Sequence, residues 1–289
     1  MDAHTRNRGV FTSVWAGTEG KVRPVRIYAI ANQKGGVGKT ADTVNLSAAL
    51  SARGRNVLAL DWDPQGHLTE ALGIEPAEDA TLAKALLGKW SGELGELVRR
   101  TAGGLFVIPT SDEMFLLETD LHALRMREWI LSKFLDNLVG VFDDVVIDCP
   151  PSLGLLNDNA LVAARRRKDD EGPQGRIVIP VQAEDSSLRA LRLFLRQVAT
   201  LQEELKIELD IAGLVVNMYD GRKGRIATST LEAFEKHPLD LLAVFKDKKE
   251  VREAWRLRTT VFEHAPESET TEGFRALVGR LDPELAVVA

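Results

Sequence analysis

Short apolar runs alternate with amphipathic stretches along most of the chain, and this alternation predicts strands and helices in turn. Seven apolar runs have the length and the β-branched content expected of buried strands. They fall near residues 25–31, 57–60, 105–108, 145–148, 176–181, 211–216 and 241–245. Buried strands that alternate with helices are typical of parallel sheets, so we predict an α/β fold with one doubly wound, mainly parallel sheet.

The helical stretches have apolar residues three or four positions apart. The clearest example begins near Asp185, where Leu188, Leu191 and Leu195 fall on one face. Residues 81–139 are expected to be mostly helical around their one strand. Further helices are predicted near residues 43–50, 155–164, 226–235, 248–256 and 269–279.

Two stretches have no such periodicity. Residues 1–23 are polar, with scattered Arg and Gly, and predict a flexible N-terminal extension. Residues 165–175 contain only charged, polar and turn-forming side chains, which predicts an exposed loop. We find no internal repeat and no linker, so residues 24–289 are expected to form one domain.

Composition limits the classes of protein that remain. The chain has 289 residues, 44% of them hydrophobic, which is enough for a sizeable core. No apolar run is long enough to span a membrane, and the N-terminus has no signal-peptide pattern. A single cysteine, Cys149, excludes an internal disulfide and a subunit-bridging iron–sulfur cluster that needs two cysteines per chain. We therefore expect a cytoplasmic protein with no membrane partner.

A glycine-rich segment between the first strand and the first helix predicts a phosphate-binding loop. Such a loop turns successive backbone N–H groups onto phosphate oxygens, beside the positive end of a helix. A lysine then contacts the β- and γ-phosphates, and the next hydroxyl is placed to ligate Mg²⁺. The segment departs from the standard pattern, because Gln33 replaces the first glycine and a second lysine enters the loop. Its residues are Lys34, Gly35, Gly36, Val37, Gly38, Lys39, Thr40 and Ala41.

Acidic residues follow two of the predicted strands. Asp61 and Asp63 end the strand near 57–60, and Asp148 ends the strand near 145–148. Carboxyl ends of parallel strands are where open α/β sheets bind ligands, so these carboxylates are predicted to surround the phosphates and Mg²⁺. The alternative is that Asp61 and Asp63 merely cap the turn that follows, since Asp is common in turns.

Together these motifs resemble those of the ParA/Soj partition ATPases, which belong to the deviant Walker ATPases together with MinD. The resemblance rests on Lys-Gly-Gly-Val-Gly-Lys-Thr, on Asp-x-Asp-Pro-Gln-Gly from Asp61, and on Asp-x-Pro-Pro-Ser from Asp148. The segments 179–184, 217–222 and 264–266 are similar to the family as well. The matching motifs run in the same order from about Arg26 to Leu281, which implies the deviant P-loop fold with ATP and Mg²⁺ as cofactors.

The resemblance implies a role for each site residue. Lys34, Lys39 and Asp63 would be catalytic: Lys34 reaches the partner's nucleotide across an ATP-sandwich homodimer, and Asp63 orients the attacking water. Thr40 would ligate Mg²⁺, and Asp148 would hold it through water. The resemblance also implies that Asp61 holds Mg²⁺ waters or Lys39 and that Asn217 recognises the adenine edge. Ala41 stands where the family usually has Thr, which is expected to weaken nucleotide binding.

The whole chain is not a basic DNA binder, because its net charge is −6. Residues 222–258 nevertheless contain ten Lys or Arg against six Asp or Glu, a local balance of +4. The resemblance implies nonspecific binding of double-stranded DNA there, whereas an ordinary solvated helix face is the alternative. A second candidate is the run from Arg165 to Lys168. The residues assigned to the DNA surface are Lys223, Arg225, Lys246, Lys248, Lys249, Arg252 and Arg256.

The predicted function is segregation of plasmid or chromosomal DNA. ATP binding would close the dimer on the nucleoid, and a ParB-type centromere-binding partner would stimulate hydrolysis and release it. One alternative is a MinD-like membrane-associated ATPase, although the C-terminal tail lacks the basic amphipathic helix that this role needs. Another is a nucleotide-switched module that positions other cargo. A metabolic ligase of the same fold is the alternative least supported by the motifs.

Overall fold

The computed structural model describes residues 25–167 and 174–283. The N-terminal extension predicted for residues 1–23 lies outside the described residues, as does the middle of the loop predicted for residues 165–175. Within the described part, no helix is long and apolar enough to cross a bilayer.

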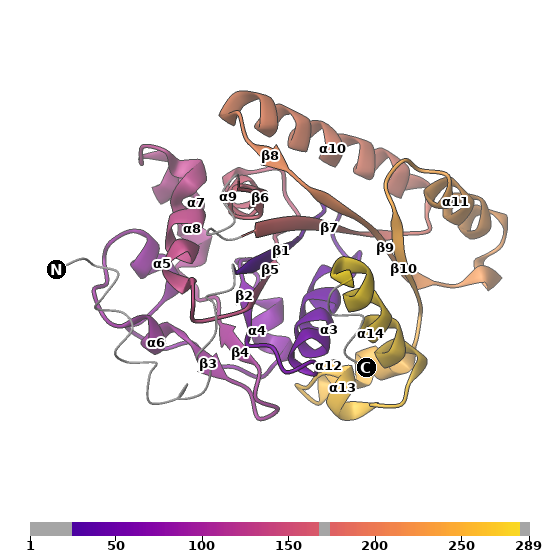
Figure 1. Ribbon diagram of the computed structural model, residues 1–289, viewed down its shortest axis with the longest axis horizontal. Coiled ribbons are helices and arrows are strands. Elements are labelled where there is room, and N and C mark those ends of the chain that lie inside the picture. The colour runs from indigo at the N-terminus through magenta and orange to yellow at the C-terminus, as the bar shows by residue number, and fades with distance from the viewer. Residues whose placement is uncertain (1–24, 168–173, 284–289) are drawn as a thin grey trace.

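A mainly parallel sheet of eight strands forms the centre of the molecule (Figure 1). Its order is β10-β9-β7-β1-β5-β2-β4-β3, and only the short edge strand β3 runs antiparallel to its neighbour. This confirms the predicted sheet. The strands are β1 (Arg26–Ile30), β2 (Val57–Asp61), β3 (Arg99–Arg100), β4 (Phe106–Ile108), β5 (Asp144–Asp148), β7 (Gln174–Gln182), β9 (Ile211–Tyr219) and β10 (Leu241–Lys246).

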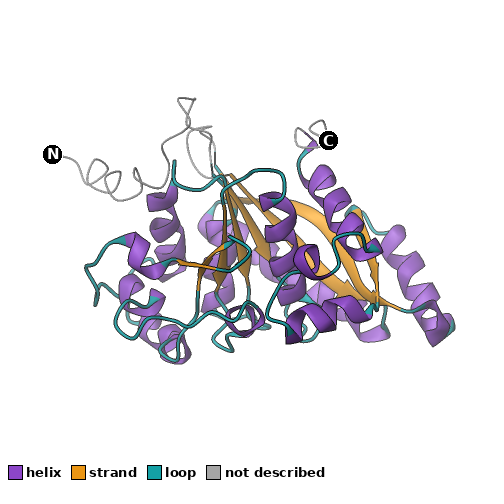
Figure 2. Ribbon diagram, turned by 90° about the horizontal axis from the view of Figure 1, so that it is seen from below, coloured by secondary structure: helices purple, strands orange, loops and turns teal. Residues whose placement is uncertain are grey.

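Helices cover both faces of this sheet (Figures 1 and 2). One face packs against α5 (Leu82–Leu86), α6 (Leu94–Leu97), α7 (Met114–His122), α8 (Ile130–Leu135), α9 (Leu155–Ala163), α10 (Asp185–Leu205) and α11 (Arg225–Glu235). The other packs against α3 (Lys39–Ser51), α4 (His67–Ala71), α12 (Lys249–Arg256), α13 (Val261–His264) and α14 (Glu269–Leu281). Short 3₁₀ turns are η1 (Arg127–Trp129), η2 (Asp136–Leu138) and η3 (Gly221–Lys223).

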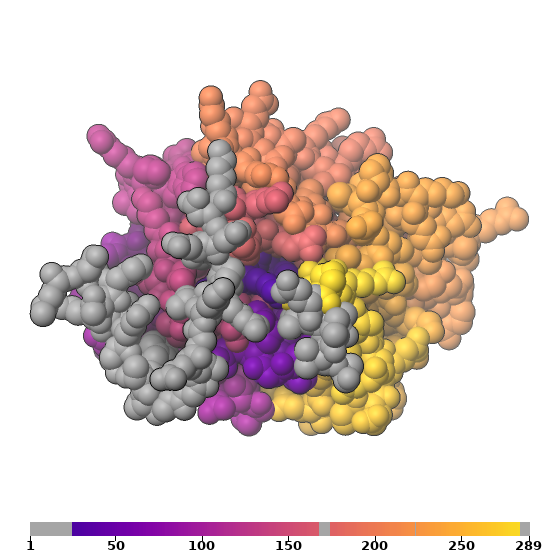
Figure 3. Space-filling model, viewed as in Figure 1, coloured from indigo at the N-terminus to yellow at the C-terminus, as the bar shows by residue number. Residues whose placement is uncertain are grey.

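Two separate hydrophobic cores result, one on each face of the sheet. Along β1, Ile27 and Ala29 belong to the core under α9 and α10, whereas Tyr28 and Ile30 belong to the core under α3 and α14. Successive side chains of a strand point to opposite faces, so a strand covered on both sides must be apolar throughout. This explains why the strands appear as continuous apolar runs in the sequence. In the space-filling view, the orange C-terminal part of the chain forms the right-hand side of the molecule (Figure 3).

The loop predicted for residues 165–175 is wrong in its described parts. β6 (Arg165–Arg166) pairs with β8 (Glu208–Leu209) in a small second sheet, and β7 already begins at Gln174. The guanidinium of Arg165 lies 4.7 Å from the ring centroid of Trp129 and donates to Ser132. Cation–π contact and hydrogen bonding therefore fix a side chain that charge alone would place in solvent.

Candidate functional site

The glycine-rich loop connects β1 to α3, as predicted, and the end of β7 supports it. Asn32 donates to the carbonyl of Pro180 at 2.6 Å, and its own Oδ1 accepts from the backbone N–H of Lys34 at 3.0 Å. Gln182 donates to the carbonyl of Gly36 at 3.1 Å. These contacts hold the loop on the carboxyl side of the sheet, where its N–H groups can meet phosphate.

Two glycines of the loop have positive φ, 73° at Gly36 and 94° at Gly38, a region that glycine adopts readily. Gly38 is also the N-cap of α3, so the helix begins directly behind the loop. A side chain at Gly38 would meet the amide of Asn217 at 2.7 Å. Glycine is therefore required there both for the turn and for close packing against β9.

The two lysines of the loop have different surroundings. Lys39 is buried, and its ammonium donates to the carbonyl of Lys34 at 3.0 Å. Desolvation lowers its pKa, although Asp148 acts in the opposite direction. The ammonium of Lys34 instead is partly exposed, 2.7 Å from Glu184 and 3.3 Å from Ser187 at the start of α10. Lys39 therefore faces into the site of its own chain, and Lys34 lies at its edge.

Asp61 and Asp63 differ in what they already bind. Asp61 is fully buried, and its Oδ2 accepts from both the N–H and the hydroxyl of Thr69 at 2.8 and 2.6 Å. Burial raises its pKa to about 7. Asp63 accepts from the backbone N–H of Gln65 at 3.0 Å. Asp61 and Asp63 therefore both stabilise the turn that leads into α4, which is the turn-capping role given above as the alternative. Each of them uses only one carboxylate oxygen for these hydrogen bonds.

Asp148 ends β5 beside β1 and β2, directly behind the loop. Its Oδ1 lies 3.5 Å from the hydroxyl of Thr43, and the side chain of Thr40 also donates to it. Burial raises its pKa well above the usual range, and nearby Asp61 acts in the same direction. One oxygen of each carboxylate, Oδ2 of Asp148 and Oδ1 of Asp61, is buried without a hydrogen-bond partner among the described residues.

These residues fit a magnesium nucleotide. Buried carboxylates with an unsatisfied oxygen require a cation, and in this part of the site only Lys39 is cationic and buried. Within the described residues, no group of three or more His, Cys, Asp or Glu could hold a metal ion by itself. In nucleotide sites Mg²⁺ keeps several waters and is bound by one or two side chains together with phosphates. Thr40 would be a direct ligand, and Asp148 would act through water.

Asn217 lies at the end of β9, where Met218 has φ of 51° and the strand is irregular. Its amide nitrogen donates to the carbonyl of Val37 at 3.0 Å and to Asp42 at 2.6 Å. The structure therefore brings Asn217 to the glycine-rich loop, with Oδ1 as the group left for a ligand.

Most of the cations assigned to DNA are already paired with carboxylates. Lys246 and Lys248 share Glu269 at 2.7 and 3.0 Å, Lys249 pairs with Glu253 at 3.4 Å, and Arg252 pairs with Asp247. Arg225 and Arg256 are exposed, with no carboxylate partner recorded among the described residues. The side chain of Lys223 lies outside the described part.

The helix predicted from Lys248 starts one residue later, at Lys249. Lys248 is extended, with φ of −117° and ψ of 144°, and turns toward Glu269 on α14. The spacing of four residues in the sequence also predicts that Lys248, Arg252 and Arg256 share one face of this helix, and that prediction is wrong, because Lys248 precedes the helix. In the second candidate run, Arg165 and Arg167 point inward, and Arg167 pairs with Asp136 at 2.6 Å.

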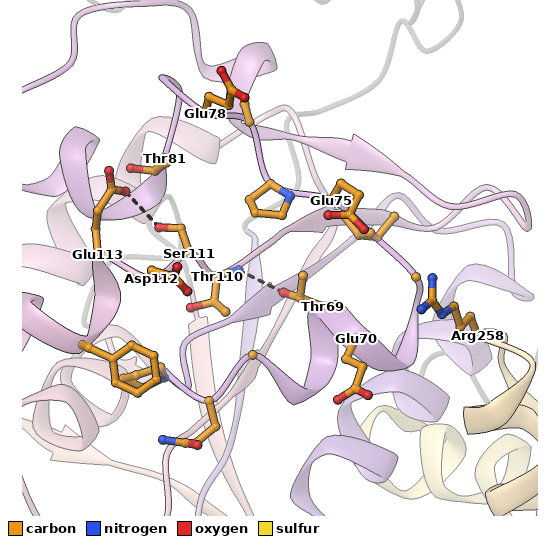
Figure 4. A pocket seen from close by; sticks show the side chains of 18 residues that line it. Thr69, Glu70, Glu75, Glu78, Thr81, Thr110, Ser111, Asp112, Glu113 and Arg258 are labelled. Carbon is orange, nitrogen blue, oxygen red and sulfur yellow. Dashed lines mark hydrogen bonds between the residues drawn. The ribbon is translucent and has the colours of Figure 1, made fainter.

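Two hollows lie beside this site. The larger, of about 550 Å³, adjoins the turn after Asp63 (Figure 4). Its lining includes Glu70, Glu75, Glu78, Asp112 and Glu113 against a single Arg258. Such an acidic lining repels phosphates, so this hollow is not the nucleotide site.

The smaller hollow, of about 260 Å³, lies between the ends of β9 and β10 and includes Tyr219 and Lys246 in its lining. Asn217 is not among its lining residues and precedes Tyr219 on β9.

Sequence reasoning missed several residues that shape the site. Asn32, Asp42 and Gln182 position the loop and Asn217 through the contacts given above, and Glu184 binds Lys34. A signal existed for Asp42, because it is an acidic residue in the first turn of the helix that follows the loop. Asn32, Gln182 and Glu184 lie at or just after the carboxyl ends of β1 and β7, where open α/β sheets bind ligands.

A strand, glycine-rich loop and helix with Lys39, Thr40 and Asp148 define a P-loop nucleotide-binding protein. A family model described as "AAA domain" matches residues 25–211. The chain is 36% identical over 223 residues to the sporulation initiation inhibitor protein Soj of Bacillus subtilis, covering 77% of this chain and 81% of Soj.

Solved structures agree with this class. Pyrococcus horikoshii MinD, complexed with Mg-ADP, has a TM-score of 0.71 at 25% identity, covering 92% of this chain and 99% of MinD. Mycobacterium smegmatis cobyrinic acid a,c-diamide synthase, with bound ADP and magnesium, has a TM-score of 0.68 at 30% identity. The match covers 87% of this chain and 91% of the synthase chain. The chain belongs to the ParA/Soj-type ATPases of the MinD/ParA superfamily. It is an ATPase, and its cofactors are ATP and Mg²⁺.

Proposed function

We propose that this ATPase segregates plasmid or chromosomal DNA as a nucleotide-switched dimer. The observation that supports this most is Lys34, a second loop lysine that lies at the edge of the site and not over its own phosphate loop. A cation supplied by a partner subunit would neutralise charge on the transferring phosphoryl group. ATP would then be held between two subunits, and hydrolysis would depend on dimerisation.

In this proposal each chain supplies the remaining chemistry. Gly35, Gly36, Val37, Gly38 and Lys39 bind the phosphates, with the backbone N–H of Ala41 near the α-phosphate. Asp63 orients the attacking water through the carboxylate oxygen that does not accept from Gln65. Asn217 contacts the adenine edge. Asp61 acts on Mg²⁺ waters from its buried position.

DNA binding would use the exposed cations of residues 222–258. Arg225 and Arg256 are the strongest candidates, since the ammonium or guanidinium groups nearby already have carboxylate partners. Exposed ion pairs contribute little energy, so phosphates of DNA could replace Glu269 or Asp247 as partners. A dimer presents two such surfaces, which would make binding ATP-dependent. A ParB-type partner would stimulate hydrolysis and release the dimer from the nucleoid in the cytoplasm.

The test is DNA binding measured by sedimentation with ATP, with ADP and without nucleotide. We expect binding of any duplex sequence with ATP, little with ADP, and a steep fall in affinity with salt. Liposome co-sedimentation is run in parallel. Binding to liposomes but not to DNA would favour the MinD-like alternative, and binding to neither would favour a module that positions other cargo.

A further inference from the structure

The amide of Asn217 is held in one orientation by two acceptors. Its nitrogen donates one hydrogen to the backbone carbonyl of Val37 at 3.0 Å and the other to Asp42 at 2.6 Å. A backbone carbonyl can only accept, so the atom against Val37 must be the nitrogen. Flipping the amide would place Oδ1 against the carbonyl oxygen of Val37.

This orientation leaves Oδ1 as the atom that meets a ligand. Asn217 is 6% exposed, and no donor to its Oδ1 is recorded among the described residues. This oxygen is also not one of the fully buried polar atoms that lack a hydrogen-bond partner in the described part of the chain. Met218, the next residue of β9, has a positive φ of 51°. The hollow lined by Tyr219 lies next along the same strand.

An oxygen that can only accept distinguishes purine bases. Adenine presents an exocyclic amino group, which donates, at the position where guanine and hypoxanthine present a carbonyl oxygen, which accepts. An acceptor facing the amino group makes a hydrogen bond, whereas two acceptors facing each other leave both desolvated and unpaired. A binding site rejects the wrong base more strongly when a buried polar group is left unpaired than when only the shape differs.

We propose that Asp42 is a positioning residue for nucleotide specificity: by fixing the amide of Asn217, it makes the site select adenine over 6-oxopurine nucleotides. The inference rests on the proposed contact between Asn217 and the base. Asp42 does not touch the nucleotide in this account and acts only through Asn217. Its place in the first turn of α3, directly behind the loop, brings its carboxylate within reach of β9.

The experiment compares the affinities of ATP and ITP, in which a carbonyl oxygen replaces the exocyclic amino group, by competition against a fluorescent nucleotide. We expect the unmodified protein to prefer ATP by roughly tenfold or more. Asp42→Ala should narrow this ratio about threefold or more, because one of the two acceptors is lost. Asp42→Asn retains an acceptor oxygen of the same length and should restore the ratio.

A double-mutant cycle separates positioning from a general structural effect. Asn217→Ala should abolish the preference, and Asp42→Ala combined with it should have no further effect on the ratio. Asn45→Ala is the matched control: Asn45 is another buried polar residue of α3, bonded to Ala41 and Val261, so its loss should leave the ratio unchanged.

Two results from the variants would overturn the inference. One is an unchanged ratio of ATP to ITP affinity in Asp42→Ala, whether or not both nucleotides bind more weakly. The other is a further, additive change of this ratio in the double variant. If Asp42→Ala does not fold, Asp42→Ser compared with Asp42→Asn supplies the test, since the shorter Ser hydroxyl should not reach the nitrogen of Asn217. An absent preference in the unmodified protein would refute this inference while leaving ATP-dependent DNA binding, the test of the proposed function, untouched.

Discussion

At the scale of single residues, the same side chain can brace a turn and serve the reaction. Asp63 shows this most clearly, because its Oδ1 accepts from the N–H of Gln65 while its second oxygen has no recorded use among the described residues. Asp61 is likewise bound to Thr69 through one oxygen only. Substitutions that keep the turn contact but remove the carboxylate charge separate the two roles.

We predict that Asp63→Asn keeps the fold and loses hydrolysis. The amide oxygen can still accept from Gln65, whereas the carboxylate that orients water is gone. Each tenfold loss in rate corresponds to about 1.4 kcal/mol of barrier. The variant should accumulate as an ATP-bound dimer in size-exclusion chromatography with ATP and Mg²⁺. Asp63→Ala should lose the turn contact as well and be less stable. An Asp63→Asn protein that stays monomeric at saturating ATP would contradict this role.

A second residue-scale prediction concerns pH. Burial raises the pKa of Asp158 from 3.8 to about 6, with Glu128 and Glu204 adding to the effect. The folded state therefore retains a proton that the unfolded chain has lost, so this group's contribution to stability is full below about pH 4 and is lost as pH rises through 6.

The substitution Asp158→Asn should remove this loss of stability at higher pH. Its oxygen can still accept from Gln197, as Oδ1 does at 2.7 Å. Because the side chain is partly exposed, we expect a gain of only about 1 kcal/mol in the free energy of unfolding at pH 7.5, shrinking toward pH 5. Urea unfolding at both pH values measures it. A gain of equal size at both would show that the proton is not involved.

At the scale of elements, α12 illustrates how neighbouring helices alter what a basic segment can bind. Its inner face, with Ala254 buried, packs in the core shared with α3 and α14. Its outer cations are partly neutralised, since Glu269 of α14 binds Lys246 and Lys248. The helical pattern was predicted correctly from spacing. The pairing was not, because Glu269 is more than 20 residues away along the chain.

Arg256 should therefore matter more for DNA than Arg252. Phosphate contacts release counterions, and log affinity falls with log salt by roughly 0.9 per contact on duplex DNA. Arg256→Ala should weaken binding equally on all sequences and flatten the salt slope. Arg252→Ala, which removes a guanidinium already paired with Asp247, is the matched variant and should weaken binding and flatten the salt slope less. If neither changes affinity or slope, the DNA surface lies elsewhere.

At the scale of the whole molecule, the phosphate loop, the carboxylates and Asn217 meet at one edge of the sheet, although they come from segments far apart in the sequence. Lys34 lies at the rim of this assembly, held by Glu184 and Ser187. An ion pair at a partly exposed position is weak enough to exchange for a nucleotide phosphate. The molecule is thus arranged so that a second subunit could receive this lysine.

Lys34→Ala should leave a folded monomer that binds ATP but does not dimerise on it. Its own phosphate contacts come from Lys39 and the loop backbone, which the substitution leaves in place. Sedimentation velocity with ATP and Mg²⁺ measures dimerisation, and fluorescent-nucleotide titration measures binding. Glu184→Gln is the control, because it removes the partner of Lys34 while keeping the lysine, and it should still dimerise. Partner-stimulated hydrolysis at the normal rate in Lys34→Ala would refute the role in trans.

The sequence by itself determined the doubly wound sheet, the phosphate loop and the carboxylates that follow β2 and β5. These features depend on local spacing: apolar runs, a glycine turn before a helix, and acids at strand ends. Only the tertiary structure decided which oxygens remain unpaired, that Arg165 is stacked on Trp129, and that Asp42 binds Asn217. Such contacts join residues far apart in the chain, and they depend on how the sheet and its helices bring side chains together.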